Sequence, residues 1–92
     1  GAKGELPKLV AVDSRSVVIE SVKKAEDTNR IMVRLYECHN TRGTTVLTCA
    51  RPIKRAYLAD LSEKVLGELE VQDGLVPIEY KPFEIVTVLL EV

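Results

Sequence analysis

The chain has 92 residues, of which 46% are hydrophobic and 29% are charged, and its formal net charge is −1. This length fits one domain with one modest core, and the composition is typical of a folded globular domain and excludes a disordered one. A net charge near zero provides no field to attract nucleic acid or an anionic membrane, and no apolar run approaches the roughly 20 residues that span a bilayer. We therefore expect one folded domain with no nucleic-acid and no membrane partner.

The opening segment, GAKGELP, is interpreted as a linker or as the remnant of an expression tag. We assign residues 1–7 to this segment and residues 8–92 to the domain.

Alternating apolar and polar residues, rich in β-branched types, predict strands along most of the chain. The first four predicted strands cover residues 8–12, 16–24, 31–38 and 44–50. Clusters of turn-forming residues separate them at 13–15, 26–30 and 39–43.

The segment 54–70, KRAYLADLSEKVLGELE, is compatible with a helix and with a strand. Its alanine, leucine, lysine and glutamate residues favour a helix. However, Leu58, Ala59 and Leu61 do not form a clean stripe at helical spacing, and a single helix would have to displace a sheet partner. We favour a strand at 55–61 followed by a connector at 62–67.

Asp73-Gly74 joins two further alternating runs and suits a type I′ hairpin turn, because both central residues of that turn need positive φ. In total the sequence predicts seven or eight short strands with turn signals about every ten residues. The predicted fold class is all-β: an antiparallel β-sandwich, immunoglobulin-like or of a related Greek-key arrangement.

The last predicted strand, 83–92, is apolar on both faces. One face carries Phe83, Ile85, Thr87 and Leu89, and the other carries Val86, Val88 and Leu90. A sandwich strand with one solvated face should not have this pattern. Either the strand is central and covered on both sides, or its second face packs on a body outside this sequence. We favour the second alternative, which makes the chain a fragment.

The segment RLYECHNTRG (34–43) places Cys38 beside the only histidine, His39. A zinc site needs three or four ligands, and neighbouring residues on a strand point to opposite faces, so thiol and imidazole would diverge. We predict a strand that enters a polar loop closed by Gly43. Cys38 and Cys49 are expected to be free, half-buried thiols in a reducing compartment, with one bridge as the alternative.

Other polar groups also predict solvated surface rather than chemistry. Most of the fourteen Asp and Glu residues alternate with apolar neighbours, and the basic cluster RPIKR (51–55) lacks the aromatic residues on which bases or sugars stack. We assign no catalytic, cofactor-binding or metal-binding residue to this sequence.

Two stretches resemble the α-mannosidases of glycoside hydrolase family 38. IMVRLYECHNTRGTTVLT (31–48) is similar to the R-L-Y-E-x-H-x-x-R-G segment near the end of those enzymes, and KPFEIVTVLLE (81–91) to their closing P-F-E-I-x-T strand. SVVIESVKKAED (16–27) also matches a family pattern. The resemblance covers about residues 8–92 and is closest to the bacterial and cytosolic branch, although the family often has alanine at Cys38 and glycine near Asn40.

The resemblance implies a parent enzyme that hydrolyses terminal α-mannosides of oligosaccharides with retention of configuration. Its aspartate nucleophile, acid/base carboxylate and zinc ion belong to an amino-terminal catalytic domain outside these 92 residues. The chain itself would be the non-catalytic C-terminal β-sandwich, inactive alone, packed on the remaining domains of a cytoplasmic enzyme. The alternative is a free-standing carbohydrate- or protein-binding β-sandwich.

Residues of the family pattern are expected to serve structure or contacts between domains. With the apolar residues of the last strand, they are Arg34, Tyr36, Glu37, Phe83, Glu84, Val86, Val88 and Leu90. Where Arg34 and Glu84 face outward, they are expected to pair with each other or with the catalytic part.

Overall fold

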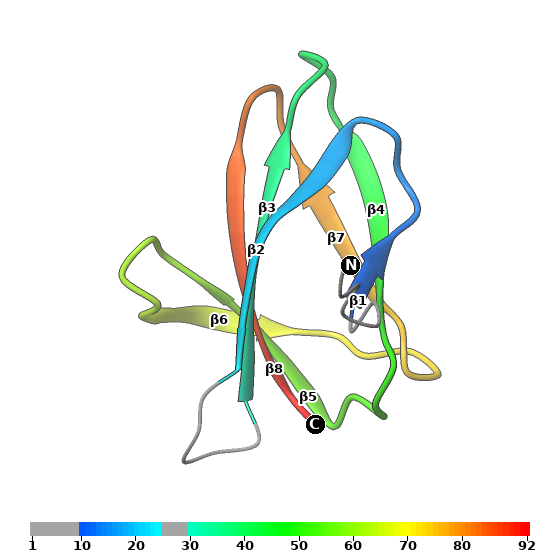
Figure 1. The fold of residues 1–92 in the computed structure, drawn as a ribbon, viewed down its shortest axis with the longest axis vertical. Coiled ribbons are helices and arrows are strands. Elements are labelled where there is room, and N and C mark those ends of the chain that lie inside the picture. Colours follow the sequence, from blue (N-terminus) through cyan, green and yellow to red (C-terminus); the bar gives the residue numbers. More distant parts are fainter. Residues whose placement is uncertain (1–9, 25–29) are drawn as a thin grey trace, which may run out of the picture.

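The computed structural model describes residues 10–24 and 30–92, and these ranges form eight β-strands in two antiparallel sheets. The strands are β1 (Val10–Val12), β2 (Val17–Lys24), β3 (Arg30–Glu37), β4 (Gly43–Cys49), β5 (Arg55–Ala59), β6 (Val65–Leu69), β7 (Val76–Tyr80) and β8 (Ile85–Glu91). A three-stranded sheet in the order β1-β4-β7 faces a five-stranded sheet in the order β2-β3-β8-β5-β6 (Figure 1). The predicted antiparallel β-sandwich is confirmed.

Some predicted segments lie wholly or partly outside the described residues. These are the linker 1–7, the start of the strand 8–12 and most of the turn 26–30. Within the two described ranges, no helix has the length and apolar character that crossing a membrane requires.

The core lies between the sheets and is filled by alternate residues of their strands. Ile31, Val33 and Leu35 of β3 point inward from the larger sheet and meet Leu47 of β4 and Val76 of β7 from the smaller one. All five side chains are buried, so the period of two along β3 places one of its faces in a dry interior.

The last strand corrects the favoured interpretation of its two apolar faces. β8 is the central strand of the five-stranded sheet, paired with β3 on one side and β5 on the other. One of its faces, with Val86, Val88 and Leu90, belongs to the core between the sheets. On the other face, Leu89 is buried with Met32 and Ala59 of the neighbouring strands, and the half-buried Tyr57 packs against them. The hypothesis that Val86, Val88 and Leu90 pack on an external body is therefore wrong.

The segment 54–70 forms a hairpin of two strands, β5 and β6, and contains no helix. The strand ends at Ala59, two residues earlier than predicted, because Asp60 closes a tight turn. Its Oδ1 accepts hydrogen bonds from the amides of Ser62 at 2.8 Å and Lys64 at 2.9 Å. The predicted connector is correspondingly too long, since the second strand begins at Val65.

The Asp73-Gly74 turn has the predicted backbone but a different role. Its φ angles of 51° and 78° are both positive, and Gln72 and Leu75 exchange two 2.8 Å backbone hydrogen bonds across it. The pairing extends no further as a ladder between β6 and β7, because these strands belong to different sheets. The turn therefore transfers the chain from one layer of the sandwich to the other.

Truncation of a core residue tests this arrangement. Leu47 is completely buried, so Leu47→Ala should lower the free energy of unfolding by about 2–5 kcal/mol through lost burial and a residual cavity. Leu61→Ala is the control, because Leu61 is 65% exposed and its truncation should change stability by about 0.5 kcal/mol or less. Denaturant unfolding of the 92-residue chain measures both, and equal effects would contradict the described core.

Candidate functional site

The RLYE motif ends where two connections meet at one end of the sandwich. β3 and β8 are antiparallel neighbours with Tyr36 opposite Ile85, so the end of β3 adjoins the start of β8. The connection 38–42, after β3, and the turn 81–84, before β8, therefore lie at the same end, uppermost in Figure 1. The Glu37 amide donates to the Glu84 carbonyl at 3.0 Å and extends the ladder into this region.

The carboxylate of Glu37 links the two connections. It is 1% exposed and accepts three hydrogen bonds from different parts of the chain. The His39 amide donates at 2.9 Å and the Thr41 hydroxyl at 2.7 Å, both from the connection after β3. The Phe83 amide donates at 2.8 Å from the turn before β8. One buried anion thus holds two loops that are more than forty residues apart in the sequence.

These hydrogen bonds keep Glu37 ionised. Burial raises the pKa of this carboxyl, but the donors from Phe83, Thr41 and His39 outweigh it and lower the pKa to about 2. A general acid near neutral pH requires a carboxyl pKa shifted in the opposite direction. The arrangement is therefore suited to holding structure and not to transferring a proton.

Two residues of these connections adopt the left-handed backbone conformation. Asn40 has φ of 58°, which asparagine tolerates and glycine adopts freely. Phe83 has φ of 54°, an unfavourable angle for a bulky residue, and its amide donates to Glu37 in that conformation. The hydrogen bond to Glu37 therefore helps to hold Phe83 in this unfavourable backbone conformation.

A second polar cluster ties the turn after β1 to the smaller sheet. Asp13 Oδ1 accepts from the Val46 amide at 2.8 Å and the Thr45 hydroxyl at 2.9 Å, and these donors hold the pKa of Asp13 below its usual value. Ser14 shares a 3.1 Å hydrogen bond with the Tyr80 hydroxyl. A Cβ at Gly43 would lie 2.9 Å from that hydroxyl, so glycine leaves room for the bond.

Cys38 and His39 lie where the predicted turn places them, and Cys49 lies on the predicted strand that follows. β3 ends at Glu37, and Cys38 then donates its amide to the Ser16 carbonyl at 2.8 Å as the chain enters the loop. Cys38 and Cys49 are free and half-buried. Cys49 is the last residue of β4, whereas Cys38 lies in the connection that precedes that strand. Within residues 10–24 and 30–92, no three His, Cys, Asp or Glu side chains are grouped to hold a metal ion.

The structure does not pair Arg34 with Glu84. Arg34 lies opposite Thr87 in the ladder and donates to its hydroxyl at 3.4 Å and to the Leu61 carbonyl at 3.3 Å. Glu84 Oε1 instead accepts from the Lys81 amide at 3.0 Å, inside its own turn. The ladder register separates the two side chains, because the outward position opposite Arg34 is three residues beyond Glu84.

The remaining predicted residues divide between the core and the surface. Val86, Val88 and Leu90 are buried between the sheets, and Tyr36 is half-buried on the outer face between Val18 and Ile85 of the neighbouring strands. Phe83 is 55% exposed.

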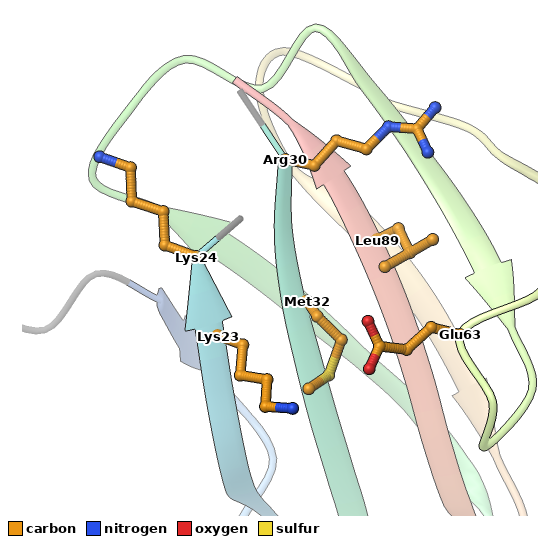
Figure 2. A pocket seen from close by; sticks show the side chains of 6 residues that line it. All are labelled: Lys23, Lys24, Arg30, Met32, Glu63 and Leu89. Atoms are coloured by element: carbon orange, nitrogen blue, oxygen red, sulfur yellow. The ribbon is translucent and has the colours of Figure 1, made fainter. Parts of the chain in front are cut away.

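A shallow hollow of about 240 Å³ on the outer face carries three basic residues, Lys23, Lys24 and Arg30. Figure 2 shows that Lys24 and Arg30 point away from its floor, while Glu63 lies over that floor. Arg30 is also engaged elsewhere, in a 3.1 Å ion pair with Glu91. These cationic groups do not converge on a common anion site.

The fold and its polar clusters define a structural β-sandwich domain, and comparison with known proteins specifies its class. Residues 16–88 match the family described as "Glycosyl hydrolases family 38 C-terminal beta sandwich domain". The chain belongs to this family, as the resemblance predicted. It is also similar to proteins named "Alpha-mannosidase 2C1" from Homo sapiens and from Mus musculus. Each is 33% identical over 85 residues, an alignment that covers 87% of this chain and 8% of the relative.

Glu37 should make stability depend on pH. Its folded pKa of about 2 lies below the ordinary value of 4.5, so its contribution is complete above about pH 4.5 and is lost as the pH falls toward 2. Glu37→Gln should therefore lower the melting temperature by several degrees at pH 7, and the difference from wild type should shrink near pH 2. The exposed Glu20→Gln is the control and should change little at either pH. If Glu37→Gln lowered the melting temperature equally at both pH values, the result would contradict a stabilising role for the ionised Glu37 carboxylate.

Proposed function

We propose that this chain is the C-terminal β-sandwich of a longer glycoside hydrolase that cleaves terminal α-mannosides of oligosaccharides. In this proposal the sandwich packs on and supports the catalytic domain and performs no chemistry itself. The observation that carries the proposal is the family match over residues 16–88, together with the printed names of the two relatives. The chain spans about 8% of the length of those relatives, so the activity belongs to the remainder of the polypeptide.

The state of the buried carboxylate supports a role without catalysis. Retaining glycosidases use one carboxylic acid with a raised pKa and a second carboxylate about 5 Å away. Glu37 has a lowered pKa, is buried, and has its oxygens occupied by donors from Phe83, His39 and Thr41. It serves as a structural anion.

The proposed catalytic domain supplies an aspartate nucleophile, an acid/base carboxylate and a zinc ion, and it hydrolyses with retention of configuration. Zinc bound there supplies Lewis-acid polarisation and orientation of the substrate. The described residues of this chain do not fit such an ion, because no three potential ligands are grouped among them. A cytoplasmic location is part of the proposal, and the free thiols of Cys38 and Cys49 suit a reducing compartment.

The alternative, a free-standing sugar-binding module, has less support. Such modules stack sugar rings on exposed aromatic side chains, and the chain has only four aromatic residues. Tyr36, Tyr57 and Tyr80 are half-buried, which leaves Phe83 as the exposed one.

Two activity assays test the proposal. The longer polypeptide that contains this domain, assayed with zinc, should hydrolyse a chromogenic α-mannoside and should not hydrolyse the corresponding β-mannoside. NMR of the first product should show the α-anomer. The 92-residue chain should show no turnover under the same conditions. Turnover by the 92-residue chain would contradict a non-catalytic role, and an inactive longer polypeptide that binds zinc would contradict the mannosidase assignment.

A further inference from the structure

We propose that the β5–β6 hairpin and the notch beside it form the surface on which the catalytic part of the longer polypeptide docks. This inference rests on the proposed function and specifies which face of the sandwich makes the contact. The notch is a hollow of about 290 Å³ between the hairpin and the start of β8.

The hairpin leaves the body of the sandwich with apolar residues uncovered. In Figure 1 it projects to the left of the two sheets, as the yellow-green segment between β5 and β6. Four of the five residues of β6 are exposed, and β6 is an edge strand with no partner on its outer side in the described sheet. Leu61 is 65% exposed and Leu66 is 63% exposed. Exposed apolar side chains grouped on one projecting element mark an interaction surface.

The hairpin is nevertheless fixed in shape. The Asp60 carboxylate accepts from the amides of Ser62 and Lys64, and backbone hydrogen bonds of 2.9 Å join Asp60 to Glu63 and to Lys64. From the sheet, the Arg34 guanidinium donates to the Leu61 carbonyl at 3.3 Å. A backbone held in this way presents its leucines at a smaller ordering cost on binding than a flexible loop would.

The notch continues this apolar surface onto the sandwich. Its floor includes Leu58 of β5, Leu66 of β6 and Ile85 of β8, and the exposed fraction of Ile85 is 43%. Ile85 is the first residue of β8 and lies outside the part of that strand that Met32 and Tyr57 cover. The exposed part of the last strand thus adjoins the exposed part of the hairpin.

The charge of the notch defines its occupant. Three carboxylates, Asp60, Glu79 and Glu84, line it, and no Lys or Arg lies among its lining residues. Arg34 borders the notch and donates to Thr87 and to the Leu61 carbonyl. The complementary surface is therefore an apolar segment flanked by Lys or Arg.

The negative charge of the notch disfavours a second copy of the chain as its occupant. In a symmetric dimer the same patch appears on both sides, so the carboxylates of one notch would face those of the other. A neighbouring domain in the same polypeptide avoids this repulsion and is present at high effective concentration. The two relatives are long enough to contain such a neighbour, since the aligned region is 8% of their length.

Hydrogen exchange tests the surface directly. Amides of residues 61–66 should exchange at least about tenfold more slowly in the longer polypeptide than in the 92-residue chain, because docking buries them. Amides of residues 72–75, at the Asp73-Gly74 turn, are the internal control and should exchange equally in both. Equal exchange at 61–66 in the two proteins would overturn the proposal.

Matched substitutions separate docking from folding. Leu66→Asp should leave the melting temperature of the 92-residue chain unchanged and lower the temperature at which the longer polypeptide loses compactness by several degrees. Leu75→Asp is the control, because Leu75 is exposed on the turn between β6 and β7. Equal effects of the two substitutions on the longer polypeptide would overturn the proposal.

Two further outcomes are distinguishable. Concentration-dependent protection of residues 61–66 in the 92-residue chain, with a dimer in sedimentation, would assign the surface to a second copy and overturn the proposal. A longer polypeptide that protects 61–66 but lacks mannosidase activity would retain the docking surface and overturn only the proposed function.

Discussion

The arrangement of this domain at its loop end depends on one buried anion. Glu37 occupies an inward position at the end of β3, where an apolar residue would be expected, and its desolvation is offset by donors from two separate connections. Because those donors come from residues 39–41 and from Phe83, the carboxylate fixes the loop after β3 against the turn before β8. The same contact lies beside the start of the central strand β8, which pairs with β3 on one side and with β5 on the other.

Local features of the sequence predicted most of the fold. The alternation of Ile31, Val33 and Leu35 indicated which face of β3 is buried, and the positive φ requirement of Asp73-Gly74 predicted its turn. These features succeed because they depend on neighbours within a few residues. The same alternation places Glu37 on the inward face, which is a local signal of a buried carboxylate.

Features that depend on distant partners could not be predicted in this way. An apolar pattern on both faces of β8 is the same whether its cover is the chain itself or another body, and only the pairing with β3 and β5 distinguishes them. The donor from Phe83 to Glu37 joins residues 46 positions apart, beyond any local pattern. Likewise, Arg34 and Glu84 both match the family motif, but the ladder register assigns them different partners.

The position of β8 in the sheet also has a consequence for biosynthesis. Seven strands leave the ribosome before β8, yet β8 fills the middle of the five-stranded sheet, between β3 and β5. Until it arrives, the edges of β3 and of the β5–β6 hairpin have no partner, and such edges recruit chaperones or aggregate. The five-stranded sheet therefore cannot be completed until β8 has been synthesised, and a polypeptide that terminates before β8 would keep both edges unpaired.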